Sequence, residues 1–278
     1  MIQNVLNSSF VRGSKALGVD LFINLDGSYD INCIVLQRTK NKIFIEEKFT
    51  DLKQINEIED KSLKGLPVCL SIHGKGVLFK LVEKKSKQKL IHQLLPNANE
   101  TDFYLQISDS DTSNHFVSAI REEILKNILE AFDKISVFVT HVYIGPFAVK
   151  NLIALLDDNT FESNHYQFEC NGDFLISVQK IQSPRFFLLK TGSEEVHPEE
   201  VLPYAAGLGF FMDFEDEVFD KVAQSKSEFT YKQLFTVLGW FSLAFFFVLL
   251  MANYLFFNQY NKKLNAANFN YRQNIEMI

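Results

Sequence analysis

The longest apolar stretch of the chain runs from Leu234 to Phe257, about 24 residues without a charged side chain. At about 1.5 Å per residue, a helix of this length crosses a hydrocarbon core of about 30 Å. A buried core helix is usually shorter and is not apolar on every side. The pattern therefore predicts one transmembrane helix over 234–257, with membrane-spanning positions at Leu234, Val237, Trp240, Phe245, Leu249 and Phe257.

A short helical stub is expected over 258–278, beyond the predicted span. Its apolar positions recur at spacings of three, four and seven, which is the beginning of a heptad stripe. The possible helix-pairing seam consists of Leu264, Ala267, Tyr271 and Ile278. Two heptads leave both a coiled coil and a frayed helix end open, and a further domain could follow residue 278.

The orientation of the span has to be inferred from features outside it, because three basic residues lie on each side. No apolar signal segment precedes the domain, and the three cysteines lack the spacing of a metal site or disulfide framework. These observations favour a reducing compartment. We therefore expect a single-pass protein with its N-terminal domain in the cytoplasm and the stub on the opposite side of the membrane.

Alternating apolar and polar residues predict a mixed α/β domain over 15–225, after a flexible tail at 1–14. Its first part, about 15–158, begins with an antiparallel meander and continues with a pair of strands joined through Gly74-Lys75. We then expect a strand, a helix, a strand that ends at Gly145-Pro146, and a second helix. The predicted ranges are 16–24, 29–37 and 42–48 for the meander, 67–73 and 76–83 for the pair, then 103–107, 114–134, 136–144 and 147–156.

The second part, about 159–212, is predicted to hold a smaller sheet. Asn171-Gly172 between two strand-like runs, 161–170 and 174–180, is typical of a hairpin turn. The run 186–190 is expected to extend this sheet, and the small residues of 204–211 predict a closely packed helix. A charged juxtamembrane linker should follow at 213–225.

The charge balance excludes one class of partner. The formal net charge is -6 and the pI is near 5.6, so the chain has no broad basic field for nucleic acid. Its partners should be proteins or lipid.

This order of elements resembles the actin-like cytoplasmic domain of bacterial inner-membrane assembly-platform proteins, namely the L protein of type II secretion and PilM of type IV pili. The local matches are Gly18-Val19-Asp20, Leu70 to Gly74 with Phe79-Lys80, Phe103 to Gln106, Val142 to Pro146, and Tyr204 to Gly209. The resemblance covers about residues 15–212. It implies an actin-like, ribonuclease-H-type fold with two subdomains, and the span matches the L protein or a PilM-PilN fusion. It also implies that the membrane is a bacterial inner membrane and that the stub is periplasmic.

The resemblance also implies a function. The chain would be a scaffold that recruits a cytoplasmic secretion or assembly ATPase, pairs with a second single-span membrane subunit and self-associates. Two other functions stay open: an actin-like membrane sensor that still binds nucleotide, and a generic membrane-tethered adaptor.

We expect no enzyme, cofactor or metal site. A phosphate-binding loop needs glycine turns that bring backbone N–H groups to the phosphates. The first loop position reads Asp20-Leu21-Phe22, with a bulky Phe where a phosphate would sit, and Asn171-Gly172-Asp173 reads as a hairpin. The six histidines are scattered without metal-ligand spacing.

Overall fold

The computed structural model describes residues 13–276 except 41, 61, 62, 64, 85–89, 112, 157, 186, 187, 192, 193 and 213–218. For residues 60 and 271–276 it describes only the backbone. The chain divides into two compact units, and one of them is Gly13–Phe229. The other contains the rest of the long C-terminal helix, from Thr230 onward. Most of the predicted tail at 1–14 lies outside the described residues.

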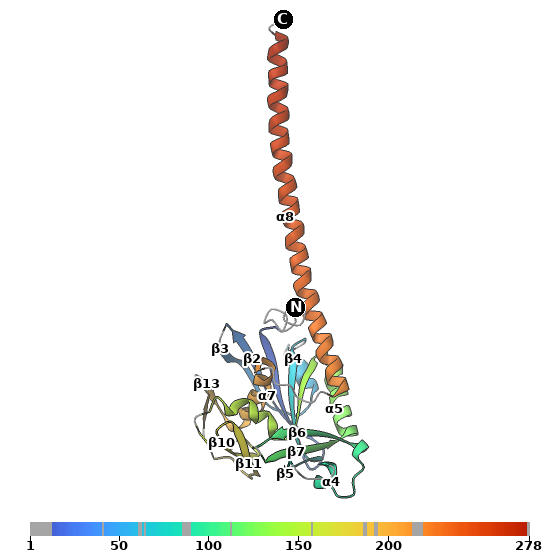
Figure 1. Cartoon of the computed structure of the whole chain (residues 1–278), viewed down its shortest axis with the longest axis vertical. Coiled ribbons are helices and arrows are strands. Elements are labelled where there is room, and N and C mark those ends of the chain that lie inside the picture. Colours follow the sequence, from blue (N-terminus) through green and yellow to red (C-terminus); the bar gives the residue numbers. More distant parts are fainter. Residues whose placement is uncertain are drawn as a thin grey trace. The chain divides into compact units, whose positions relative to one another are not determined.

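A five-stranded mixed sheet lies at the centre of the first unit (Figure 1), in the order β3-β2-β1-β4-β8. The first three strands form the predicted antiparallel meander, while β4 is parallel to β1 and β8 is parallel to β4. Three antiparallel strands followed by two parallel ones in this order are the ribonuclease-H-type arrangement, so the predicted actin-like fold class is confirmed. The strands are β1 (Lys15–Ile23), β2 (Tyr29–Thr39), β3 (Lys42–Leu52), β4 (Pro67–Gly74) and β8 (Phe138–Ile144).

Helices cover both faces of this sheet. One face packs against α3 (Asn56–Asp60) and α5 (Glu122–Lys134) through a cluster of buried aliphatic side chains. The other face packs against α7 (Val201–Met212), α6 (Lys150–Ile153) and the short 3-10 helix η2 (Pro146–Val149). Because both faces are buried, the central strands β1 and β4 consist almost entirely of buried residues.

The helix α7 approaches β1 at backbone distance. A Cβ atom added to Gly18 would lie 1.8 Å from the carbonyl oxygen of Pro203 and 2.7 Å from the amide nitrogen of Gly207. Only glycine on the strand, facing another glycine on the helix, permits this approach. The small-residue helix predicted at 204–211 is thus confirmed, together with its close packing.

A second sheet of three strands, in the order β5-β7-β6, lies between β4 and α5 in sequence. Its elements are β5 (Val77–Glu83), the short helices α4 (Leu90–Leu94) and η1 (Glu100–Asp102), β6 (Phe103–Asp109) and β7 (Asn114–Arg121).

Two predictions made for this region are wrong. The helix predicted over 114–134 begins only at Glu122, because its first part is the central strand β7, buried from Phe116 to Ile120. Apolar spacing cannot distinguish a strand buried on both faces from a helix. The runs 67–73 and 76–83 do not pair with each other either. The turn at Gly74 directs β5 into the second sheet, where it pairs with β7.

One glutamine joins the two sheets. Gln106 on β6 is buried, donates from Nε2 to the carbonyl oxygen of Val142 at 3.0 Å, and accepts the N–H of Ile144 at 2.7 Å. Both partners lie on β8, the edge strand of the central sheet. The glutamine side chain therefore bonds to the backbone groups of this edge strand that a neighbouring strand would otherwise pair with.

Replacing Gln106 with Met should cost about 2 kcal/mol, because it leaves a buried N–H and a buried carbonyl oxygen unpaired at nearly unchanged side-chain volume. Denaturant unfolding of the detergent-solubilised chain, followed by near-ultraviolet circular dichroism, measures the change. The control is Gln179→Met, since Gln179 is an exposed glutamine on a strand. Equal losses in the two variants would contradict the role of Gln106 as a joint.

Two small sheets complete the unit. The predicted hairpin at Asn171-Gly172 is confirmed: β10 (Tyr166–Asn171) pairs antiparallel with β11 (Phe174–Lys180), and β9 (Thr160–Glu162) adds to β10. The prediction that 186–190 extends this sheet is wrong. Residues 186 and 187 lie outside the described residues, and β12 (Leu189–Thr191) pairs instead with β13 (Glu194–Val196), which precedes η3 (Pro198–Glu200).

The last helix, α8 (Asp220–Glu276), begins inside the folded unit. Phe219, Val222 and Phe229 are buried, the first two in the cluster under α5 and the third in the cluster under α7. A linker is predicted over 213–225; its residues 213–218 lie outside the described residues, and from Asp220 onward the chain is helical.

Candidate functional site

The candidate site lies at the end of the central sheet where the parallel strands β1 and β4 terminate. In an actin-like fold, this edge is where the phosphates of a nucleotide would meet the first loop. The turn between β1 and β2 spans Asn24 to Ser28, whereas Asp20-Leu21-Phe22, expected as the first loop, lies within β1. The strands stay paired up to Ile23 and Tyr29, so the turn lies at Asp26-Gly27-Ser28 as the meander pattern predicts, and the phosphate-loop reading of 20–22 is wrong.

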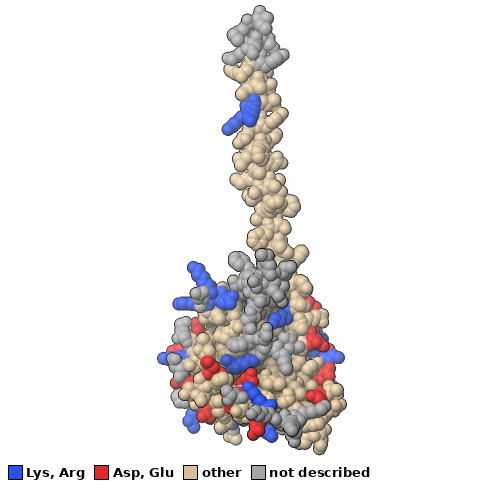
Figure 2. Space-filling model, viewed as in Figure 1, with Lys and Arg blue, Asp and Glu red and all other residues tan. Residues whose placement is uncertain are grey.

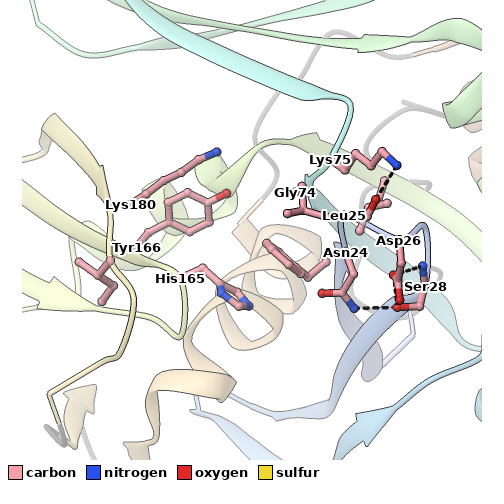
Figure 3. A pocket seen from close by; sticks show the side chains of 12 residues that line it. Asn24, Leu25, Asp26, Ser28, Gly74, Lys75, His165, Tyr166 and Lys180 are labelled. Carbon is pink, nitrogen blue, oxygen red and sulfur yellow. Dashed lines mark hydrogen bonds between the residues drawn. The ribbon is translucent and has the colours of Figure 1, made fainter.

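Several polar groups of the β1–β2 turn form hydrogen bonds with one another (Figure 3). The amide N–H groups of Asn24, Gly27 and Ser28 donate to the Ser28 carbonyl, the Asn24 carbonyl and the Asp26 carboxylate, respectively. The Ser28 hydroxyl also donates to the Asp26 carboxylate at 2.7 Å, and this bond holds the pKa of Asp26 below its ordinary value. These three N–H groups are therefore not directed at an external anion.

The end of β4 closes onto the same turn. Gly74 has a φ of +103°, and a Cβ atom there would lie 2.3 Å from the carbonyl oxygen of Ile23. That oxygen accepts the N–H of Lys75, whose ammonium group donates to the carbonyl oxygen of Leu25 at 2.6 Å. Lys75 thus ties the β4 end to the turn.

A buried histidine–aspartate pair lies directly behind the turn. His73 on β4 is fully buried, and its Nε2 lies 2.7 Å from Oδ1 of Asp20 on β1. Both side chains lie on the face of the sheet that is covered by α7. The neighbours of Asp20 along β1, Val19 and Leu21, point to the opposite face and belong to the cluster there. The Asp20 carboxylate, the group that could organise Mg²⁺ in an active site, is therefore engaged by a histidine.

Aromatic rings fill the space in front of this pair. Phe22 stacks on His165, with ring centroids 3.9 Å apart and an interplanar angle of 14°. Tyr166 contacts His73 edge-on at 5.3 Å and is buried. His165 and Tyr166 come from the start of β10, so the second part of the domain supplies half of this packing.

A cavity of about 710 Å³ opens beside the ring stack (Figure 3). Its wall is formed by the β1–β2 turn on one side and by His165, Tyr166 and Lys180 on the other. Besides these side chains it is lined by Phe22, Ile23, Gly74, Lys75 and Ile181. Two lysines and one aspartate give the cavity a small net positive charge, which suits an anion. The apolar part of its lining suits an organic ligand.

These residues do not fit a nucleotide triphosphate with its metal ion. Three N–H groups of the turn are bonded within the turn, the Asp20 carboxylate is paired with His73, and the Phe22 ring is stacked on His165. No group of three or more His, Cys, Asp or Glu side chains within the described part of the chain is arranged to hold a metal. Phe22, expected at a phosphate position, lies within β1 and stacks on His165, and the absence of a nucleotide site stays a prediction.

The three cysteines, Cys33, Cys69 and Cys170, are buried in this fold. Burial raises the pKa of the Cys33 thiol well above its ordinary value, with a further contribution from Asp20, and raises that of Cys170 to about 11. These shifts favour the protonated form of both thiols at neutral pH.

Burial lowers the pKa of His165, and the nearby His73 lowers it further. The unfolded chain then binds more protons than the folded one below about pH 6.5, so the domain should lose stability as the pH falls through this range. We expect the melting temperature to drop between about pH 7.5 and about pH 5.5, and to drop less in His165→Phe, which keeps the ring stack.

The matched control for this pH dependence is His92→Gln, because His92 is exposed. This variant should keep the full pH dependence of the parent. If His165→Phe and the parent showed the same change in melting temperature, the titration of His165 would not contribute.

The predicted membrane-spanning residues lie on α8, which is long and apolar enough to cross a membrane, and none of its apolar window is buried. Trp240, Phe245, Leu249 and Phe257 are exposed, and Leu234 and Val237 are half-buried. In the predicted pairing seam, Leu264 and Ala267 are exposed on the same helix, and Tyr271 lies in it without a described side chain. Ile278 lies outside the described residues, and the pairing itself stays a prediction.

The sequence spacing does not predict that two of the six histidines meet. His73 and His165 lie 5.8 Å apart between ring centroids, and His165 also lines the cavity. One signal could have found His73. In a ribonuclease-H-type sheet β4 lies beside β1, so residues at the ends of these two strands must be neighbours. His73 at the end of β4 is in register with Phe22 at the end of β1.

The sequence matches no protein-family model and no curated protein. The solved structures that are similar to the chain include these two. One is the cytoplasmic domain of EpsL, an inner membrane component of the type II secretion system of Vibrio cholerae. Its TM-score is 0.40 at 13% identity, over 60% of this chain and 68% of that chain. The other is a Bacteroides thetaiotaomicron protein with an actin-like ATPase fold and unknown function. Its TM-score is 0.33 at 9% identity, over 60% of this chain and 71% of that chain. The first belongs to the group that the sequence resembles, while the assignment of the fold rests on the strand order.

Proposed function

We propose that the chain is a non-enzymatic scaffold of a bacterial inner-membrane machine related to type II secretion or type IV pili. Its actin-like domain would hold the cytoplasmic ATPase of that machine at the membrane. Its span would pair with a second single-span subunit, and copies of the chain would associate with one another. EpsL is described as an inner membrane component of a type II secretion system.

One observation carries the proposal. At the end of the parallel strands, Asp20 is bonded to His73 and Phe22 is stacked on His165, so the side chains that could receive a phosphate and its metal ion are engaged with one another. A domain of this fold without a working phosphate site would be suited to binding a protein partner. Its last residues continue directly into a helix that can span a membrane. The machine itself is suggested by the sequence resemblance to assembly-platform proteins.

Binding of the ATPase is the direct test. The detergent-solubilised full chain, immobilised by an affinity tag, should retain the hexameric secretion or assembly ATPase of the same bacterium at micromolar concentration. An unrelated single-span protein in the same detergent is the control. Absence of retention would contradict the scaffold function and leave the generic membrane-tethered adaptor.

A nucleotide-binding sensor is the second candidate, favoured by the cavity of about 710 Å³ that remains beside Lys75 and Lys180. ATP with Mg²⁺ at about 100 times its dissociation constant would stabilise the domain by about 2.7 kcal/mol. For the scaffold we expect no shift in melting temperature with millimolar ATP. A rise would favour the sensor, whether or not the ATPase binds.

A further inference from the structure

The ends of the central sheet are chemically different. β1, β4 and β8 run in the same direction, so their first residues lie together at the end opposite to the cavity. β2 finishes and β3 begins at this same end, because Lys15 is in register with Gln37, and Thr39 with Lys42. The turn of the β2–β3 hairpin therefore projects beyond the start of β1.

This hairpin turn is basic. We call Arg38, Lys40 and Lys42 the basic tip; Lys40 and Lys42 are exposed and Arg38 is half-buried. No Asp or Glu occurs in the sequence between Asp30 and Glu46. Within the described part of the chain no ion pair joins these three cations to a carboxylate, whereas the neighbouring Lys15 is paired with Glu46. Figure 2 shows Lys and Arg side chains gathered at the end of β2 and β3.

A row of aromatic contacts connects the basic tip to the end of the folded unit. The Arg38 guanidinium lies 5.5 Å from the ring centroid of Phe211, and Phe211 contacts Phe210 at 5.3 Å. Phe210 in turn lies 6.1 Å from Phe229, which also contacts Phe138 at the start of β8. The chain thus leaves the domain at the same end of the sheet that carries the basic tip.

The membrane must begin close to this end. Phe229 is the last residue of the folded unit, and the charge-free stretch starts at Leu234. Five helical residues cover roughly 7 Å, which is about one Debye length at physiological ionic strength. Cations at this end of the domain therefore come within electrostatic reach of the lipid headgroups.

We propose that the basic tip of the β2–β3 hairpin binds the anionic headgroups of the bilayer in which α8 is anchored. Lys and Arg side chains close to an anionic leaflet are attracted to it, and the attraction falls off within a Debye length. Because α8 already tethers the domain, the tip meets the lipid at a high effective concentration, so three cations suffice. Binding would fix the tilt of the domain against the membrane and does not depend on the proposed partner ATPase.

The test places an environment-sensitive dye at the tip of the full chain. Thr39 is exposed between two of the cations, and the native cysteines are buried, so Thr39→Cys can be labelled with a nitrobenzoxadiazole group. The labelled chain is reconstituted in nanodiscs of phosphatidylcholine, with or without about 30 mol% phosphatidylglycerol. We expect a blue shift and a gain in emission in the anionic discs, reversed by about 0.5 M NaCl.

The variant Arg38→Gln with Lys40→Gln and Lys42→Gln should abolish the difference between neutral and anionic discs. A matched control removes three exposed lysines from other parts of the domain, Lys80→Gln, Lys126→Gln and Lys180→Gln, and should retain it. Lys180 lines the cavity at the opposite end of the sheet. Equal emission in both kinds of disc, or loss of the shift in the control, would overturn the proposal.

Discussion

Replacing Gly18 with alanine should displace α7 from the central sheet and destabilise the domain by about 3 kcal/mol or more, the upper range for overpacking. The added methyl carbon would lie 1.8 Å from a backbone oxygen of α7, and a backbone atom cannot move aside as a flexible side chain can. For a domain of this size the melting temperature should fall by roughly 10 °C. Near-ultraviolet circular dichroism of the solubilised chain measures the transition.

Gly239→Ala is the control for this variant. It makes the same chemical change on α8, where nothing lies within 4 Å of the added carbon. Its melting temperature should match that of the parent. If Gly18→Ala melted within about 2 °C of the parent, corresponding to less than about 1 kcal/mol, the contact between β1 and α7 would have to be looser than described.

The second large effect is expected at the buried pair. His73→Leu should cost about 3–5 kcal/mol, because it leaves the Asp20 carboxylate buried without its partner. The loss should appear as a lower denaturant midpoint with an unchanged slope, since the surface exposed on unfolding stays the same. The exposed-site variant His92→Gln should be within about 0.5 kcal/mol of the parent.

A double variant separates the pair from simple packing. When Asp20→Leu is added to His73→Leu, the orphan carboxylate disappears and apolar side chains replace both partners, a change that is often neutral or stabilising. We expect the double variant to regain most of the stability lost in the single one. Additive losses at the two positions would contradict a direct interaction between Asp20 and His73.

The parts of the fold that could be predicted are those determined by local signals. The β1–β2 and β10–β11 hairpins follow from turn residues such as Asp26-Gly27 and Asn171-Gly172, and the helix at 204–211 from its small residues. The strand β7 could not be predicted, because it is buried on both faces and lacks the alternation of an ordinary strand. The separation of β4 from β5 depends on the positive φ of Gly74, which the sequence does not distinguish from a hairpin turn.

One residue of the candidate site could be identified from the sequence. Phe22 is a bulky ring near the end of the first strand, and the structure places it at the end of β1, beside the cavity. Its partner His165 could not be identified, since the two residues are far apart in sequence and meet only when the second part of the domain folds onto the first. If β1 is assumed to pair in parallel with β4, the positions of Asp20 and His73 in the sequence predict that the two residues lie close together.

The first turns of α8 have a consequence for biosynthesis. Phe219, Val222 and Phe229 complete both hydrophobic clusters of the domain, yet they belong to the segment that continues into the apolar stretch. During translation these side chains leave the ribosome only just ahead of the hydrophobic segment, and domains fold as units once their sequence has emerged. The final maturation of the domain and the delivery of its anchor to the insertion machinery therefore occur within the same short interval of synthesis.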